Sequence, residues 1–373
     1  MWKIPLFRIY QDEEDVKKVT DVIKRGEYWA LGPEIIEFES RIAKYAATKY
    51  CVVFNSGTSA LHAALLACKI KDGAKIAVPS FSFIATANCT LFVGGRPVFV
   101  DIEEERLGMN PEGLGQIVRK EKIDAVIPVH YGGCPCKIEE IVRESKKAIV
   151  IEDAAESFGA TNKGKMTGTF GAAGVLSFAP NKVITTGEGG AVITDNREIY
   201  ERLILARSHG RLDVAGNYFA TTEASDYVEL GYNFRMASMV AALGVAQIEK
   251  AEKIISMRRQ RADYLNKKLG KIPEVEILHE PNSCRHVYQI YSIRIKRNRD
   301  GLLKKLKEAG IMSKVYFAPI HLTTFYKKQF GYHGGELPVT EKVSKQIMAL
   351  PIYPHIGEQE MDYVCKEVAE FFG

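Results

Sequence analysis

Three segments of the chain carry residues whose types and spacing could do chemistry. The first is Asn55-Ser-Gly-Thr-Ser-Ala-Leu, which follows a predicted strand and opens a predicted helix. Free backbone amides and the helix dipole at such a start attract anions, so a phosphate could approach Gly57 and bond the hydroxyls of Thr58 and Ser59. Taken alone, the segment is more typical of an ordinary serine or threonine N-cap.

The second segment, Ile151-Glu-Asp-Ala-Ala-Glu-Ser-Phe-Gly, places Asp153 at the carboxyl end of an apolar run. A carboxylate beside a pyridine nitrogen favours the protonated ring, which then acts as an electron sink for a carbanion. The alternative is a helix-capping aspartate, which this segment by itself favours.

The third segment runs from Gly174 through a Pro-Asn turn to Lys182 and a glycine-dense return ending at Gly190. A lysine whose pKa is lowered by burial and nearby cations can form a Schiff base, but one lysine among many is a weak signal. The order of the three segments is stronger, because a phosphate cradle, an acid and a turn lysine each follow a strand of one predicted sheet.

The elements that must position these residues are short apolar strands alternating with helical patterns such as Thr58 to Cys68. Such strands predict a mostly parallel sheet that is buried on both faces and binds ligands beyond its carboxyl edge. The seven predicted strands are Cys51 to Phe54, Lys75 to Val78, Pro97 to Val100, Ala125 to Val129, Ala148 to Ile151, Gly174 to Phe178 and Ala191 to Thr194.

A smaller C-terminal α/β domain is predicted to follow. A long helical pattern from Ala237 to Leu269 could bridge the two domains, and further strand candidates lie at Val287 to Ile295 and Ser313 to Phe317. We therefore expect a large domain over residues 1–250 and a small domain over residues 251–373. The helix-like stretch Glu13 to Arg25 could pack against either.

Composition narrows the class of protein. The 373 residues are 46% hydrophobic and 26% charged, and the net charge of +5 is interspersed, which is weak support for nucleic-acid binding. Neither a signal peptide nor an apolar run of about 18 residues is recognisable, so we expect a cytoplasmic protein without a membrane span. The seven cysteines predict reduced thiols, and the Cys134/Cys136 pair lacks further ligands at metal-site spacing.

The sequence resembles the DegT/DnrJ/EryC1/StrS family of sugar aminotransferases over nearly its whole length. These enzymes have the aspartate-aminotransferase fold, known as PLP fold type I. The motifs that carry the resemblance are Gly32-Pro33 with Phe38-Glu39, Asn55-Ser-Gly-Thr-Ser-Ala-Leu, Pro79-Ser-Phe-Ser-Phe-Ile-Ala-Thr-Ala, Glu152-Asp-Ala-Ala-Glu, Ser177-Phe-Ala-Pro-Asn-Lys, Thr186-Gly-Glu-Gly-Gly, His209-Gly, Gly231-Tyr-Asn-Phe-Arg-Met, Pro319-Ile-His-Leu and Leu350-Pro-Ile-Tyr.

The resemblance implies a bound pyridoxal 5'-phosphate (PLP) and assigns residues to it. Lys182 would hold PLP as a Schiff base, Asp153 would pair with the pyridine nitrogen, and Glu156 would lie near the phenolic oxygen. Phe83 would stack on the ring, with a core phenylalanine as the alternative. Gly57, Thr58 and Ser177 would contact the phosphate.

Two further positions follow from the resemblance. Asn233 matches an asparagine that reaches the phosphate from the neighbouring subunit, which implies a homodimer with shared active sites; a plain turn asparagine is the alternative. His321 resembles a position near the sugar site, and a packed loop histidine is the alternative there. No metal is implied.

Glu156 is the informative departure, because many family members have glutamine at this position. Glutamate is similar to members that make 4-amino sugars such as perosamine on a GDP carrier. The implied reaction moves an amino group from glutamate to a nucleotide-linked keto-sugar, with Lys182 as the proton shuttle.

Two alternative functions would require different sequence features. A related sugar dehydratase uses the same fold with pyridoxamine phosphate, but there histidine replaces the lysine. A regulatory protein would be expected to show a helix-turn-helix or a concentrated basic surface, and the sequence suggests neither.

Overall fold

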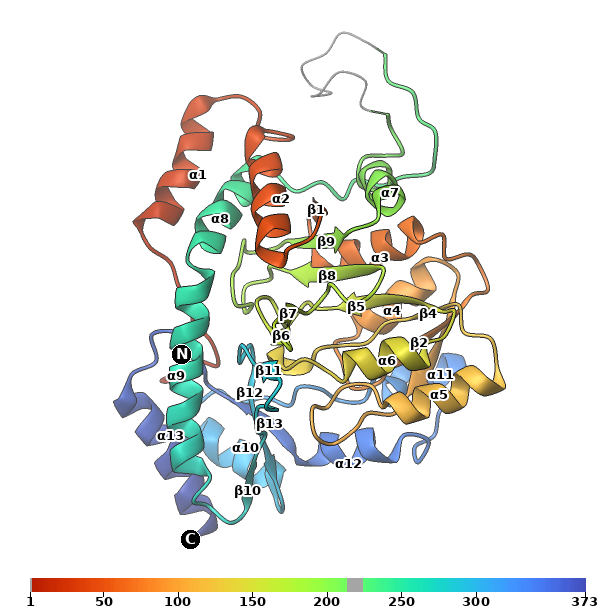
Figure 1. Ribbon diagram of the computed structural model, residues 1–373. Helices are drawn as coiled ribbons and strands as arrows, with labels where there is room; N and C mark the ends of the chain where they lie inside the picture. The colour runs from red at the N-terminus through yellow and green to blue at the C-terminus, as the bar shows by residue number, and fades with distance from the viewer. Residues whose placement is uncertain (1, 213–223) are drawn as a thin grey trace.

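A seven-stranded sheet lies at the centre of the computed structural model, which describes residues 2–212 and 224–373 (Figure 1). Strand β9 is antiparallel to both its neighbours, β1 and β8, and all other pairs are parallel. All seven strands predicted from the apolar runs are present, so the mostly parallel sheet is confirmed. In spatial order they are β1 (Tyr50–Phe54), β9 (Gly190–Thr194), β8 (Ala173–Ser177), β5 (Ile149–Asp153), β4 (Ala125–Val126), β2 (Lys75–Pro79) and β3 (Arg96–Val100).

Both faces of this sheet are buried because side chains alternate along each strand. In β1, Val52 and Phe54 pack into one apolar cluster, whereas Cys51 and Val53 pack into another on the opposite face. The first face is covered by α3 (Gly57–Ala67), α4 (Ala85–Phe92) and α7 (Arg197–Arg207); the other is covered by α2 (Pro33–Ala46), α8 (Ser238–Glu249), α5 (Pro111–Lys120) and α6 (Ile138–Glu144).

Local signals explain where the first helices begin and end. Helix α1 (Glu13–Arg25) has Asp12 as its N-cap in a capping box with Asp15, and it stops at Gly26 in the left-handed region with φ 77°. Its predicted bounds are confirmed, and it packs on α8. Helix α3 is capped by Ser56, whose Oγ accepts from the Ser59 amide at 3.0 Å.

The C-terminal part has its own apolar core, formed by a small sheet and by the helices that pack on it. Figure 1 shows α9 leading from the large sheet to this region. Ile4, from the N-terminal segment, joins the core. The elements of this core are α9 (Ala251–Leu269), β10 (Val275–Ile277), β12 (Tyr291–Ile295), α10 (Arg299–Glu308), β13 (Ile347–Leu350) and α13 (Glu358–Phe372). The C-terminal part also contains α11 (Thr324–Phe330) and α12 (Pro338–Gln346), whose buried side chains pack in other apolar clusters.

The predicted continuous helix from Ala237 to Leu269 is wrong, because α8 and α9 are separated at Lys250. The Lys250 ammonium pairs with Asp12 at 2.5 Å and Asp15 at 2.9 Å, which ties the break to the start of α1. The domain boundary placed near this residue stays a prediction.

Two of the strand predictions in the C-terminal part need correction. The strand at Ser313 to Phe317 is wrong: an isolated bridge joins Lys314 to Ala349 there, and the Tyr316 carbonyl accepts from the Tyr131 hydroxyl. The strand predicted at Val287 to Ile295 begins only at Tyr291, because the amides of Val287 and Ile290 bond the turn at Gly132 and Gly133 instead. Strand β13 was not predicted.

A third, minor sheet joins the two parts of the chain. It contains β6 (Thr161–Asn162), β7 (Lys165–Met166) and β11 (Cys284–Arg285). Within residues 2–212 and 224–373, no helix is both long and apolar enough to cross a membrane.

Candidate active site

Lys182 and Glu156 meet at the carboxyl edge of the large sheet. Lys182 lies in the turn after β8, where its amide donates to Ala179 O at 3.0 Å, and Glu156 follows β5. The Lys182 Nζ is 3.6 Å from Glu156 Oε1, and both side chains are largely buried, at 13% and 9% exposure. Glu156 Oε2 accepts from the Gly132 amide at 2.9 Å. The lysine amine therefore lies beside a fixed carboxylate, sheltered from bulk water.

Asp153 ends β5 and is almost fully buried. Its Oδ2 accepts from the Thr86 hydroxyl at 2.8 Å, and its Oδ1 accepts from the Ala155 amide at 3.2 Å. Burial raises the pKa of Asp153, while these two donors and the charges of Lys182 and His130 act in the opposite direction. A carboxylate in this setting can accept a hydrogen bond from a protonated ring nitrogen.

The predicted phosphate cradle is the start of α3. Ser56, and not Thr58, caps the helix, and Thr58 is exposed. The Ser59 hydroxyl donates to Asn55 Oδ1 at 2.7 Å, within the same loop. A Cβ on Gly57 would lie 3.0 Å from Ser177 Cβ, so these two predicted phosphate contacts, from β8 and α3, are neighbours.

Phe83 precedes α4 and is 60% exposed, which excludes the alternative of a core phenylalanine. Its ring centroid is 6.4 Å from that of Phe317, so aromatic side chains from the two parts of the chain lie near one another. This exposed aromatic face at the entry to α4 is available to a flat ligand.

Asn233 is exposed and lies beside the cradle of its own chain. Its carbonyl accepts from the Asn55 side-chain amide at 3.4 Å, and the Asn55 backbone amide donates to Phe234 O at 2.8 Å. The contribution of Asn233 to a neighbouring subunit stays a prediction.

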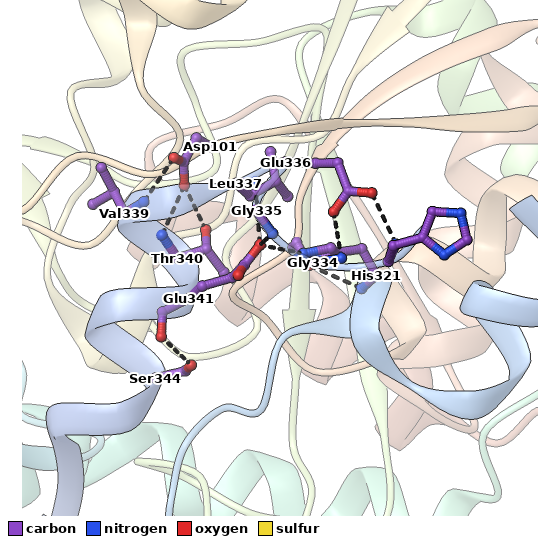
Figure 2. Close-up of polar contacts among 12 residues, drawn as sticks. Asp101, His321, Gly334, Gly335, Glu336, Leu337, Val339, Thr340, Glu341 and Ser344 are labelled. Carbon is purple, nitrogen blue, oxygen red and sulfur yellow. Dashed lines mark hydrogen bonds and ion pairs between the residues drawn. The ribbon is translucent and has the colours of Figure 1, made fainter. Parts of the chain in front are cut away.

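His321 is fully buried and both ring nitrogens have partners. Nδ1 is 2.7 Å from Ser80 Oγ, at the end of β2, and Nε2 is 3.2 Å from Glu341 Oε1 in α12. Figure 2 shows His321 and Glu341 among the contacts of this region. These contacts fit the alternative of a packed loop histidine; a role at the sugar site stays a prediction.

The same region joins the C-terminal part to the large sheet. Asp101, directly after β3, accepts from the amides of Val339 and Thr340 at the start of α12 (Figure 2). Ligand atoms of His321, Glu336 and Glu341 lie within 4.8 Å of one another. Both carboxylates already accept from backbone amides of residues 333–337, so local turns account for the cluster.

Two side chains that hold the site together were not predicted from the sequence. The Thr86 hydroxyl donates to Asp153. Thr86 lies in the motif that begins at Pro79, but no role was predicted for it. Gln289, from the C-terminal part, donates to the carbonyl of Asn181, next to Lys182. The amides of Val287 and Ile290 bond Gly133 O and Gly132 O, in the turn that binds Glu156. No local sequence pattern signals these long-range contacts.

The chain is similar to known proteins over nearly its whole length. The model of the DegT/DnrJ/EryC1/StrS aminotransferase family matches residues 10–369. The GDP-perosamine synthase of Escherichia coli O157:H7 is 32% identical over 99% of this chain and 98% of the synthase. An aminotransferase of the same family from Brucella abortus has a TM-score of 0.88 at 31% identity, covering 97% of this chain and 96% of that chain. Helicobacter pylori PseC, an aminotransferase involved in pseudoaminic acid biosynthesis, has a TM-score of 0.90 at 27% identity, covering 100% and 98%.

Proposed function

The chain belongs to the DegT/DnrJ/EryC1/StrS aminotransferase family, and from this premise we propose that it transfers an amino group from glutamate to a GDP-linked 4-keto-6-deoxy sugar. The family consists of PLP-dependent sugar aminotransferases, so the cofactor and the type of reaction are those of an aminotransferase. The donor, the carrier and the keto position are the proposed part.

The residues at the sheet edge fit PLP. Gly57 approaches Ser177 so closely that an added Cβ would lie 3.0 Å from Ser177 Cβ, Asp153 is a buried acceptor, and Phe83 offers an exposed ring. When bound, PLP supplies an electron sink for negative charge at the substrate carbon. Thr58 and Ser59, at the start of α3, would join the phosphate contacts.

The observation that carries the proposal is the Lys182 amine beside Glu156 and near Asp153. The Lys182 amine would attach the cofactor and, once displaced, carry a proton at its Nζ. Asp153 would hold the ring nitrogen protonated, and Glu156 would lie near the phenolic oxygen. A lysine here favours amino transfer over dehydration, where relatives carry histidine.

Two related observations support the proposed sugar. The glutamate at position 156 is similar to that of family members that aminate GDP-linked sugars. A relative that is 32% identical over nearly its full length is named GDP-perosamine synthase. The test supplies purified protein with PLP and glutamate, and compares GDP-4-keto-6-deoxymannose with UDP-4-keto sugars. Faster formation of the 4-amino product from the GDP substrate supports the proposal; equal rates on both carriers would defeat it.

The same assay separates the other functions. A deoxygenated product from the keto-sugar would instead indicate a dehydratase. A pure protein that takes up no PLP and has no turnover would indicate a regulatory protein.

We also propose that the enzyme is a homodimer in which Asn233 of the partner subunit contacts the phosphate. The supporting observations are the exposed position of Asn233 and the nearby Leu230, which is 83% exposed. Mixing a Lys182→Ala chain with an Asn233→Ala chain tests this. Shared sites would restore one intact site per mixed dimer, whereas sites within one chain would give no recovery of activity.

A further inference from the structure

A chain of buried hydroxyl groups leads to Asp153 from the loop after β2. Ser82 Oγ is 2.7 Å from Thr86 Oγ1, and Thr86 Oγ1 is 2.8 Å from Asp153 Oδ2. The exposed fractions of the three residues are 4%, 1% and 5%. The contacts are therefore made away from bulk water, where a hydrogen bond to a charged group is strong.

The direction of these hydrogen bonds follows from the number of protons. An ionised Asp153 can only accept, so the single hydroxyl proton of Thr86 must point at Oδ2. Ser82 must then donate to Thr86. With both protons oriented this way, the chain stabilises the charged carboxylate.

The same turn supports the exposed aromatic ring. The Thr86 amide donates to Phe83 O at 3.1 Å, at the entry to α4. The main chain of Asp153 is held from the other side, because its amide donates to Pro128 O at 2.9 Å and its carbonyl accepts from His130 at 3.2 Å. With its backbone held by the segment that follows β4 and Oδ2 held by α4, the Asp153 carboxylate has little freedom to rotate.

We propose that Thr86, supported by Ser82, is a positioning residue that holds the Asp153 carboxylate in the orientation in which it meets the ring nitrogen of PLP. This inference rests on the proposed role of Asp153. Thr86 itself contacts neither the cofactor nor the substrate in this assignment; it acts through the aspartate.

Electrostatics supports the geometry. Burial raises the pKa of Asp153, and the Thr86 hydroxyl is the largest influence opposing that rise. Without the hydroxyl, a larger share of the carboxyl groups would be protonated and unable to hold the ring nitrogen in its charged form.

The experiment compares Thr86→Val, Thr86→Ser and Thr90→Val in the full-length protein. Thr90 is the matched control, because it is a fully buried threonine of the same helix whose hydroxyl bonds Ala87 O at 2.8 Å and not Asp153. Two quantities are measured: the dissociation constant of PLP from the apoprotein, by cofactor absorbance, and kcat with its pH profile.

For Thr86→Val we expect kcat to fall about 10- to 100-fold, as for a lost hydrogen bond to a charged group. We also expect weaker PLP binding and an acidic limb of the pH profile displaced to higher pH. In Thr86→Ser and Thr90→Val, kcat and the dissociation constant of PLP should each stay within about threefold of the wild-type value. Equal defects in Thr86→Val and Thr90→Val, or no rescue by serine, would overturn the inference.

If Thr86→Val does not fold, Ser82→Ala replaces it, with a smaller loss of kcat and the same displacement of the acidic limb expected; an unmoved limb would overturn the inference. Failure of the proposed function can be distinguished from failure of the inference about Thr86 alone. If the proposed function is wrong, the wild-type protein will neither bind PLP nor transfer an amino group. That result would overturn the inference as well.

Discussion

The amine of Lys182 lies 3.6 Å from Oε1 of Glu156, although one residue follows β8 and the other follows β5. The other oxygen of Glu156 is held by the Gly132 amide, so the carboxylate is fixed before any ligand arrives. The site is therefore preorganised around the lysine, and removing water from such a pair strengthens the interaction between the charges.

Replacing Lys182 with alanine should reduce amino transfer by about 10²- to 10⁴-fold, because the proton shuttle and the point of cofactor attachment are both lost. The measurement is kcat together with the absorbance of covalently held PLP. Lys163→Ala is the control, because Lys163 is an exposed lysine paired with Glu139. Wild-type turnover by Lys182→Ala would contradict the assignment of Lys182 as the residue that attaches PLP and carries the proton.

Replacing Gly57 with alanine should weaken PLP binding by about tenfold or more, equivalent to 1.4 kcal/mol or above. The new Cβ would lie 3.0 Å from Ser177 Cβ and would push apart the two sides of the cradle. Titration of the apoprotein with PLP measures the effect. Gly113→Ala, whose new Cβ would meet nothing closer than 3.7 Å, should bind PLP normally. Unchanged affinity in Gly57→Ala would contradict a phosphate site at this position.

Replacing Gln289 with leucine should lower kcat about tenfold while changing the free energy of unfolding by about 1 kcal/mol or less. The substitution removes the donor to Asn181 O, beside Lys182, but it also removes Gln289 Oε1, a buried acceptor without a hydrogen-bond partner. Steady-state kinetics and urea unfolding separate the two effects. The exposed Gln329→Leu serves as the control, and a Gln289→Leu enzyme with wild-type kcat would show that the contact does not position the lysine turn.

His286 should make the fold sensitive to acid. Burial lowers the pKa of His286 to about 3, below the usual 6.5, and its Nδ1 accepts from the Tyr288 amide at 2.8 Å. Below pH 6.5 the unfolded chain binds a proton at this histidine that the folded chain does not bind. The contribution of His286 to the free energy of unfolding is therefore fully present above pH 6.5 and is lost as the pH falls toward 3.

At pH 5 this effect amounts to about 2 kcal/mol. The measurement is urea unfolding of the apoprotein at pH 5 and pH 8. Between these pH values, the free energy of unfolding should fall by that amount less in His286→Asn than in wild type. The side-chain oxygen of the asparagine can still accept from Tyr288. The exposed His333→Asn should behave as wild type. The same acid loss in His286→Asn and wild type would exclude His286 as the source.

The strands were predictable because a strand buried on both faces must be apolar along its length, and the runs at Cys51 to Phe54 and Gly174 to Phe178 satisfy this condition locally. The strand predicted at Ser313 to Phe317 failed for the opposite reason. Its apolar and aromatic residues pack across to Tyr131 and Phe83, and side-chain type alone does not reveal whether a partner strand is present.

The sequence alone determined which residues reach the carboxyl edge of the sheet, since Asp153 ends a strand and Gly57 and Lys182 lie in the segments that follow strands. Tertiary structure alone decided what holds them there. Thr86 on Asp153, Gln289 beside Lys182 and Gly132 on Glu156 are contacts between segments distant in the chain. Their energies depend on burial and on hydrogen-bond geometry that exist only once these segments have packed together.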